Sequence, residues 1–249
     1  MAADGLAVAV CRYGAHERHA THTDTHSRIS FLIAGGYREE GKPGQMRMRP
    51  GDVLLKSRRA KHEDEFGEDG AVIAAIEFTA NDPFDANEAP ELWRRRDDAF
   101  ALRHAIAFLE AAHFADLQAA RAAGHDLVAA SSRPIAERSA PPWLQRLKRE
   151  LEDASLASVN VAARALEAGA HPVHASRLFR QCFGASVTEH AQAQSVRRAI
   201  APLADTRETL SNVALAAGFY DQSHMNRIFR RVTGRTPGMM RAVLAAAAG

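Results

Sequence analysis

The chain has little cysteine and no long hydrophobic run. Its only two cysteines, Cys11 and Cys182, lie in different halves of 249 residues and show no metal-ligand spacing. Such sparse cysteine is typical of a reducing compartment, so we expect a cytoplasmic protein. No stretch of about 20 apolar residues occurs, so we expect no transmembrane helix. The N-terminal residues lack a basic segment ahead of their short apolar run, so we expect no signal peptide.

Motifs for the common kinds of catalysis are also missing. The sequence shows no Ser/His/Asp arrangement, no Walker phosphate-binding loop and no dinucleotide-binding fingerprint. With 46% apolar and 25% charged residues, the composition is that of an ordinary globular protein. We therefore expect neither an enzyme nor a bound cofactor.

Charge is distributed unevenly between the two halves. From residue 141 onward there are 14 Lys/Arg and 8 Asp/Glu, a net charge of +6, whereas residues 1–140 carry a net charge of −4. A basic half joined to an acidic half indicates that only the C-terminal part meets a polyanion. Ordinary solvated surface charge is the alternative explanation.

The hydrophobic pattern changes along the chain and predicts an α+β protein. Residues 6–80 alternate like short strands between Gly and Pro turns, with one strand ending at Gly35 and Gly36, which is typical of a small barrel or sandwich. From about 91 to 130 the period is helical, starting near Arg94, and Gly124 is expected to separate two helices. Residues 131–142 resemble a linker. We thus predict domains at 1–130 and 143–249.

The last third of the chain contains the same pattern twice. Ser176–Arg180 is repeated as Asn226–Arg230, with 50 positions between the two phenylalanines, and Gly184 matches Gly234 at the same offset. A glycine turn lies upstream of each copy. A repeated helix, turn and helix predicts two helix-turn-helix units, and residues 186–203 are expected to form one long helix that joins them.

Each unit has a polar helix face with side chains suited to base edges. In the second unit Ser211 is a candidate N-cap, and Met225, Ile228 and Phe229 are expected to be buried. In the first unit Leu166 is expected to face inward. Glutamine and asparagine suit adenine, arginine suits guanine, and valine can touch a thymine methyl group. A helical bundle with merely solvated polar residues is the alternative.

Residues 211–241 resemble the signature of AraC-type transcription regulators. They contain the Ala-x-x-x-Gly-Phe, Gln-Ser, Arg-x-Phe-Arg and Gly-x-Thr-Pro elements at the family's spacing. Two residues depart from the family pattern: Ala175 in the first repeat and Met225 in the second. The resemblance, over about 145–243, implies double-stranded DNA as the partner, with RNA polymerase as a further one. It implies base contacts from Val173, Ser176, Arg177, Gln222, Ser223, Asn226 and Arg227, and we expect backbone contacts from Arg180, Arg230 and Arg231.

The N-terminal half resembles a cupin barrel through Pro50-Gly51-Asp52 and the later His62. Such a barrel would be a sensor for a small-molecule effector, and its following helix could contribute to a homodimer. The histidines His22, His26 and His62 are candidate metal ligands, but the family pattern implies no metal. A polar arm, pH sensing or effector contact are the alternatives for these histidines.

Three functions are compatible with these features. The duplicated helix-turn-helix favours a ligand-responsive transcription regulator that acts through a population shift. A cupin enzyme would need a complete His/Glu ligand set, and an architectural DNA binder would not need the strand region. Effector, operator and direction of regulation stay open.

Overall fold

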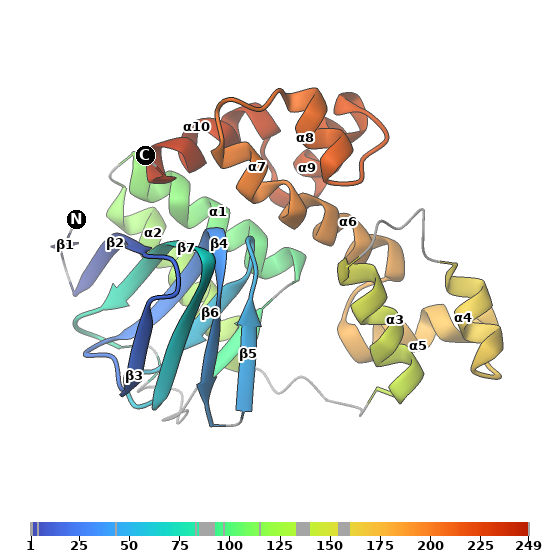
Figure 1. Cartoon of the computed structure of the whole chain (residues 1–249), viewed down its shortest axis with the longest axis horizontal. Helices are drawn as coiled ribbons and strands as arrows, with labels where there is room; N and C mark the ends of the chain where they lie inside the picture. The colour runs from blue at the N-terminus through green and yellow to red at the C-terminus, as the bar shows by residue number, and fades with distance from the viewer. Residues whose placement is uncertain are drawn as a thin grey trace.

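The computed structural model describes residues 2–3, 5–42, 44–82, 84, 93–96, 98–114, 116–132, 140–153 and 160–248. The N-terminal half forms an antiparallel sheet, and helices follow it to the end of the chain (Figure 1). This arrangement confirms the predicted α+β class. The strands are β1 (Ala2–Ala3), β2 (Leu6–Tyr13), β3 (Arg18–His22), β4 (Ser27–Gly41), β5 (Gly44–Met48), β6 (Val53–Lys56), β7 (His62–Phe78) and β8 (Trp93–Arg96).

The sheet is built on its two longest strands. The order is β1-β2-β7-β4-β6-β8, and β3 pairs with β7 while β5 pairs with β4. Along β4, Phe31 and Ile33 belong to one buried cluster and Leu32 to another, because successive side chains point to opposite faces of a strand. Apolar residues therefore cover both faces of the sheet.

Helices cover one face of this sheet and continue into the C-terminal half. Helices α1 and α2 pack on each other and share a cluster with sheet residues such as Ile76. The helices are α1 (Ala99–His113), α2 (Leu117–Ser132), α3 (Pro142–Asp153), α4 (Val161–Glu167), α5 (Pro172–Phe183), α6 (Val187–Arg198), α7 (Ile200–Ala204), α8 (Leu210–Ala216), α9 (Gln222–Thr233) and α10 (Pro237–Ala248).

Three local expectations for the N-terminal half were wrong. The strand β4 continues through Gly35, whose φ of 73° lies at a register shift and not at the end of the strand. Arg94 lies in β8, paired with Leu55, and the helix begins only after the N-cap Asp98. Gly124 lies inside α2, where a Cβ would be 3.2 Å from the Ile76 side chain, so close packing on the sheet explains this glycine.

The joining helix of the C-terminal half was predicted as one continuous element, and this was also wrong. Helix α6 ends at Arg198 and α7 begins at Ile200, with a turn at Ala199 between them. Ala199 is fully buried against the large cluster, so packing on the rest of the protein fixes the break. The linker residues 133–139 lie outside the described residues, and the domain boundaries stay a prediction.

The two halves of the chain share one hydrophobic core. The large cluster includes the sheet face that the helices cover. It also includes α1 and α2 and buried residues of α6 to α10. By contrast, α3 and α5 form a separate cluster with the start of α6, and they extend to one side in Figure 1. The second helix-turn-helix unit is therefore docked on the sheet domain, whereas the first is connected to it mainly through α6.

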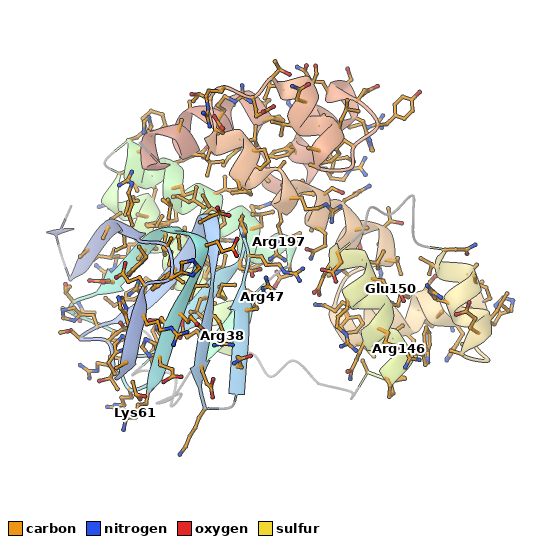
Figure 2. All side chains as sticks on the ribbon, viewed as in Figure 1. Arg38, Arg47, Lys61, Arg146, Glu150 and Arg197 are labelled. Carbon is orange, nitrogen blue, oxygen red and sulfur yellow. The ribbon has the colours of Figure 1, made fainter. Side chains whose placement is uncertain are left out.

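A buried ion pair joins the sheet to α6. The Asp52 carboxylate pairs with the Arg197 guanidinium, and both side chains are almost completely buried. Figure 2 labels Arg197 where the sheet meets the helices. Gly51 allows this approach, because its φ is 84° and a Cβ there would lie only 2.9 Å from the Arg197 Cβ. The Pro-Gly-Asp turn is thus an interdomain contact.

The surroundings of Arg197 make a negative partner necessary. Burial, together with the nearby cations Arg49 and Arg198, lowers the pKa of Arg197 to about 9. The side chain still carries its charge at neutral pH. An uncompensated charge in such a place costs several kcal/mol, so Asp52 stabilises the contact by neutralising it.

We expect Asp52→Asn to lower the free energy of unfolding by about 3–5 kcal/mol, because it leaves a buried cation without a counter-charge. The backbone N–H of Arg49 donates to Asp52 Oδ2 at 2.8 Å, and the side-chain oxygen of asparagine can still accept this hydrogen bond. Urea unfolding of the full chain measures the change. Combining Asp52→Asn with Arg197→Met removes both charges and should recover much of the loss. A single variant as stable as the parent would contradict this role.

Candidate nucleic-acid interface

The second helix-turn-helix unit consists of α8 and α9. Gly218 between them has a φ of 84°, and Phe219 is buried directly after it. Met225, Ile228 and Phe229 are all at most 1% exposed, at helical spacing along α9. The predicted core of this unit is confirmed, and it fixes which face of α9 remains outside.

The outer face of α9 carries the predicted base-contacting residues. Ser223 and Arg227 are exposed, and Gln222 and Asn226 are half-buried. The Ser211 hydroxyl donates to the Gln222 side-chain oxygen at 3.0 Å. Ser211 is therefore not the predicted N-cap. That position belongs to Thr209, whose side chain accepts from the Asn212 N–H; both residues suit a cap, so their order in the sequence could not decide between them.

The first unit consists of α4 and α5. Gly169 provides the turn with a φ of 70°, and the His171 ring accepts from the Val173 N–H at the start of α5. Ala175 and Phe179 are buried, although alanine fills less space than the usual residue. The predicted inward position of Leu166 was wrong, since this side chain is 64% exposed. The helix α4 is only seven residues long and buries Ala165 alone.

The outer face of α5 also matches the prediction. Val173 is 62% exposed, and Ser176 and Arg177 are exposed beside it. The Ser176 hydroxyl donates to the Pro172 carbonyl at 3.1 Å. The predicted contact residues of the first unit therefore lie on the solvent-facing side of α5.

The two recognition helices, α5 and α9, end in the same way. Gly184 and Gly234 have φ values of 74° and 79°, and their N–H groups donate to the carbonyls of Arg180 and Arg230. Both are left-handed C-caps of the kind that favours glycine. The repeat seen in the sequence is thus a repeat of local geometry.

The three arginines expected to contact the DNA backbone have different surroundings from one another. Arg230 is exposed on α9. Arg180 pairs with Glu189 at 3.1 Å, and hydrogen bonds from Ser186, with a smaller effect of Arg180, lower the pKa of Glu189. The Arg231 guanidinium donates to the Gln192 side chain at 3.4 Å. Arg180 is thus held beside a carboxylate, and the other donors of its exposed guanidinium remain directed to solvent.

Helix α1 holds the end of the second recognition helix. The Arg103 guanidinium donates to the carbonyls of Arg231 and Val232 at 2.9 and 3.1 Å. Arg235, just beyond α9, pairs with Glu110 at 2.6 Å. Sequence reasoning missed this contact, because no local pattern relates residues more than 120 positions apart. The apolar stripe of α1, which we expected partly in a dimer, packs on the chain's own sheet and helices.

The candidate metal ligands are only partly brought together. The rings of His22 and His62 lie 4.3 Å apart, whereas His26 belongs to none of the possible ligand groups found among the described residues. The structure therefore does not bring His26 together with the other two candidates. His19 and Asp64 lie beside His22 instead, because the strands β3 and β7 pair there.

Part of the chain matches known proteins. A family described as a helix-turn-helix domain matches residues 164–242. The arabinose operon regulatory protein of Escherichia coli K12 is 33% identical over 106 residues, which cover 41% of this chain and 36% of that protein. The Salmonella typhimurium protein is 37% identical over 71 residues, covering 28% and 25%. The chain thus spans about a third or less of the length of these relatives.

Two solved structures are similar to the chain at low TM-scores. ToxT from Vibrio cholerae O395 is 10% identical, with a TM-score of 0.40 over 96% of this chain and 98% of that one. The C-terminal domain of AraT from Geobacillus stearothermophilus is 20% identical, with a TM-score of 0.38 over 42% and 87%.

The helices from α4 to α10 are a helix-turn-helix domain. In this part the chain is similar to a helix-turn-helix domain family, and the relatives it matches are arabinose operon regulatory proteins.

The start of the second recognition helix depends on one cap. The Asp221 carboxylate accepts from the His224 N–H at 2.6 Å. We expect Asp221→Ala to lower the free energy of unfolding by about 1 kcal/mol, because it leaves a helix N–H without its partner. Denaturant unfolding measures the loss, and Asp221→Asn should stay within a few tenths of the parent. Equal losses for alanine and asparagine would show that the cap is not the cause.

Proposed function

We propose that the chain is a sequence-specific DNA-binding transcription regulator that responds to a small effector through its sheet domain. The matched family is a helix-turn-helix domain, and the matched relatives are arabinose operon regulatory proteins. The observation that carries the proposal is the pair of recognition helices, each with a buried apolar face and an exposed polar face. Two such faces in one basic domain suit successive segments of the DNA major groove.

In this proposal the exposed faces of α5 and α9 read base edges in the major groove. Arg177 and Arg227 are exposed, and arginine suits the paired acceptors of guanine. Gln222 and Asn226 suit adenine, and Val173 suits the thymine methyl group. Arg180, Arg230 and Arg231 would bind phosphates at the ends of the same helices.

The shared core suggests how an effector would act. The second unit is attached to the sheet domain by α1, whereas the first unit is attached mainly through α6, which the Asp52–Arg197 pair holds against the sheet. A ligand that favours one arrangement of the sheet domain would shift the population of orientations between the two units. Contact with RNA polymerase and homodimer formation belong to this proposal through the family resemblance.

Selection of bound duplexes from a random pool provides the operator for the central test. On that operator Arg227→Ala should weaken binding by about 1–3 kcal/mol, roughly 5- to 150-fold, and relax the preference at one base position. Fluorescence anisotropy measures the affinity. Arg12→Ala, which removes an exposed arginine from the sheet domain, is the matched control and should leave affinity unchanged. If Arg227→Ala binds every operator variant as the parent does, Arg227 is not a base contact.

Salt dependence tests the phosphate contacts separately. The logarithm of the binding constant should fall linearly with the logarithm of salt concentration, by about 0.9 for each phosphate neutralised. Arg230→Ala should reduce this slope by about 1 while weakening all sequences alike. A slope near zero would mean that the basic domain does not bind the DNA backbone.

A further inference from the structure

A cluster of histidine and aspartate side chains lies on one face of the β3–β7 pair. His19 is opposite Asp64 and His22 is opposite His62, with a β-bulge between the two pairs. In a regular strand, residues three apart point to opposite faces. The extra residue of the bulge turns His19 and His22 to the same face, as bulges commonly do beside functional sites.

In each of the two β3 imidazoles, one ring nitrogen donates a hydrogen bond. The other ring nitrogen keeps a lone pair that could bind a metal. His19 donates from Nε2 to the Glu17 carboxylate at 2.9 Å, which leaves its Nδ1 lone pair directed at the cluster. His22 donates from Nδ1 to the Ala20 carbonyl at 2.8 Å, which leaves Nε2. Metal-binding histidines are held in this way, with the second ring nitrogen donating to a carboxylate or carbonyl.

Asp64 supplies a carboxylate that lacks an ordinary partner. Its side chain is only 10% exposed, and its buried Oδ1 accepts no hydrogen bond. Its Oδ2 lies 3.7 Å from His19 Nδ1 and 3.8 Å from His62 Nε2. Leaving a buried carboxylate oxygen unsatisfied is costly unless a cation or donor reaches it.

The neighbouring Lys56 does not pair with the Asp64 carboxylate. Lys56 Nζ lies 2.6 Å from His62 Nε2, 3.1 Å from Glu39 and 3.2 Å from Asp24, so its ammonium group already serves these three side chains. His62 is therefore occupied as an acceptor. His19, His22 and Asp64 remain as the set outside the reach of that ammonium group.

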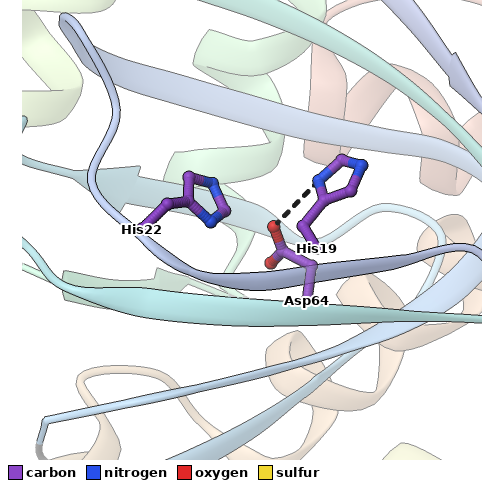
Figure 3. Close-up of side chains that lie close together, drawn as sticks. All are labelled: His19, His22 and Asp64. Carbon is purple, nitrogen blue, oxygen red and sulfur yellow. Dashed lines mark ion pairs between the residues drawn. The ribbon is translucent and has the colours of Figure 1, made fainter.

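We propose that His19, His22 and Asp64 bind a divalent transition metal, with zinc as the best match to two imidazoles and one carboxylate (Figure 3). Their ligand atoms lie within 4.8 Å of one another. Tetrahedral zinc needs about 3.3 Å between ligands, which rotation of the side chains supplies. Three protein ligands leave a fourth coordination position open to water or a small ligand. The site does not depend on the proposed DNA binding.

Zinc titration of the full chain, freed of metal with a chelator, tests the site. We expect one equivalent to bind in competition with a chromophoric chelator, and cobalt to give the visible absorption of a histidine-carboxylate site. Glu17→Ala should weaken zinc binding about 10-fold, because it removes the group that orients His19. Asp64→Asn and His22→Gln remove ligands and should weaken it further.

Two controls separate this site from other histidines. His26→Gln should bind zinc as the parent does, and so should His171→Gln combined with His174→Gln in the helix-turn-helix domain. Equal thermal unfolding of the metal-free variants shows that lost binding is not lost folding. If Asp64→Asn is unstable, the more exposed His22→Gln decides. Absence of zinc binding, or binding that survives Asp64→Asn and His22→Gln together, would overturn the proposal.

Discussion

The buried Asp52–Arg197 pair is the contact on which the relation between the two halves depends. It brings the turn before β6 against α6, at the point where that helix passes from the first helix-turn-helix unit to the second. Gly51 permits the close approach, and burial of Arg197 makes the opposing carboxylate necessary. Such a pair specifies one docking geometry, because any displacement leaves a buried charge without its partner.

This contact gives the two helix-turn-helix units different surroundings. The second unit belongs to the same hydrophobic core as the sheet, and Arg103 of α1 bonds the carbonyls at the end of its recognition helix. The first unit has a small core of its own around Phe179. A change in the sheet domain therefore reaches the second unit through a shared core, and the first mainly through α6 and through the ion pair between Arg49 and Asp153 of α3. For the proposed function, this unequal attachment is a physical basis for coupling the sheet domain to the orientation of α5 and α9.

Much of the helix-turn-helix half could be predicted from its residues. The buried positions Met225, Ile228 and Phe229 follow from helical spacing, and the turns follow from Gly169 and Gly218. The wrong predictions concern positions where the local sequence allows more than one residue to cap a helix or to be buried. Thr209 and Ser211 can both cap a helix, and the short α4 buries too few residues for a pattern to place Leu166. Local rules limit such choices, but packing decides among them.

The sequence by itself determined the existence, order and polar faces of the two helix-turn-helix units, because caps, glycine turns and helical periodicity act over a few residues. Tertiary structure decided that Ala199 interrupts the joining helix, that Asp52 meets Arg197, and that a bulge places His19 beside Asp64. These features depend on strand register and on contacts between segments distant in the chain. Their free energy comes from burying several elements together, so no single segment contains the information.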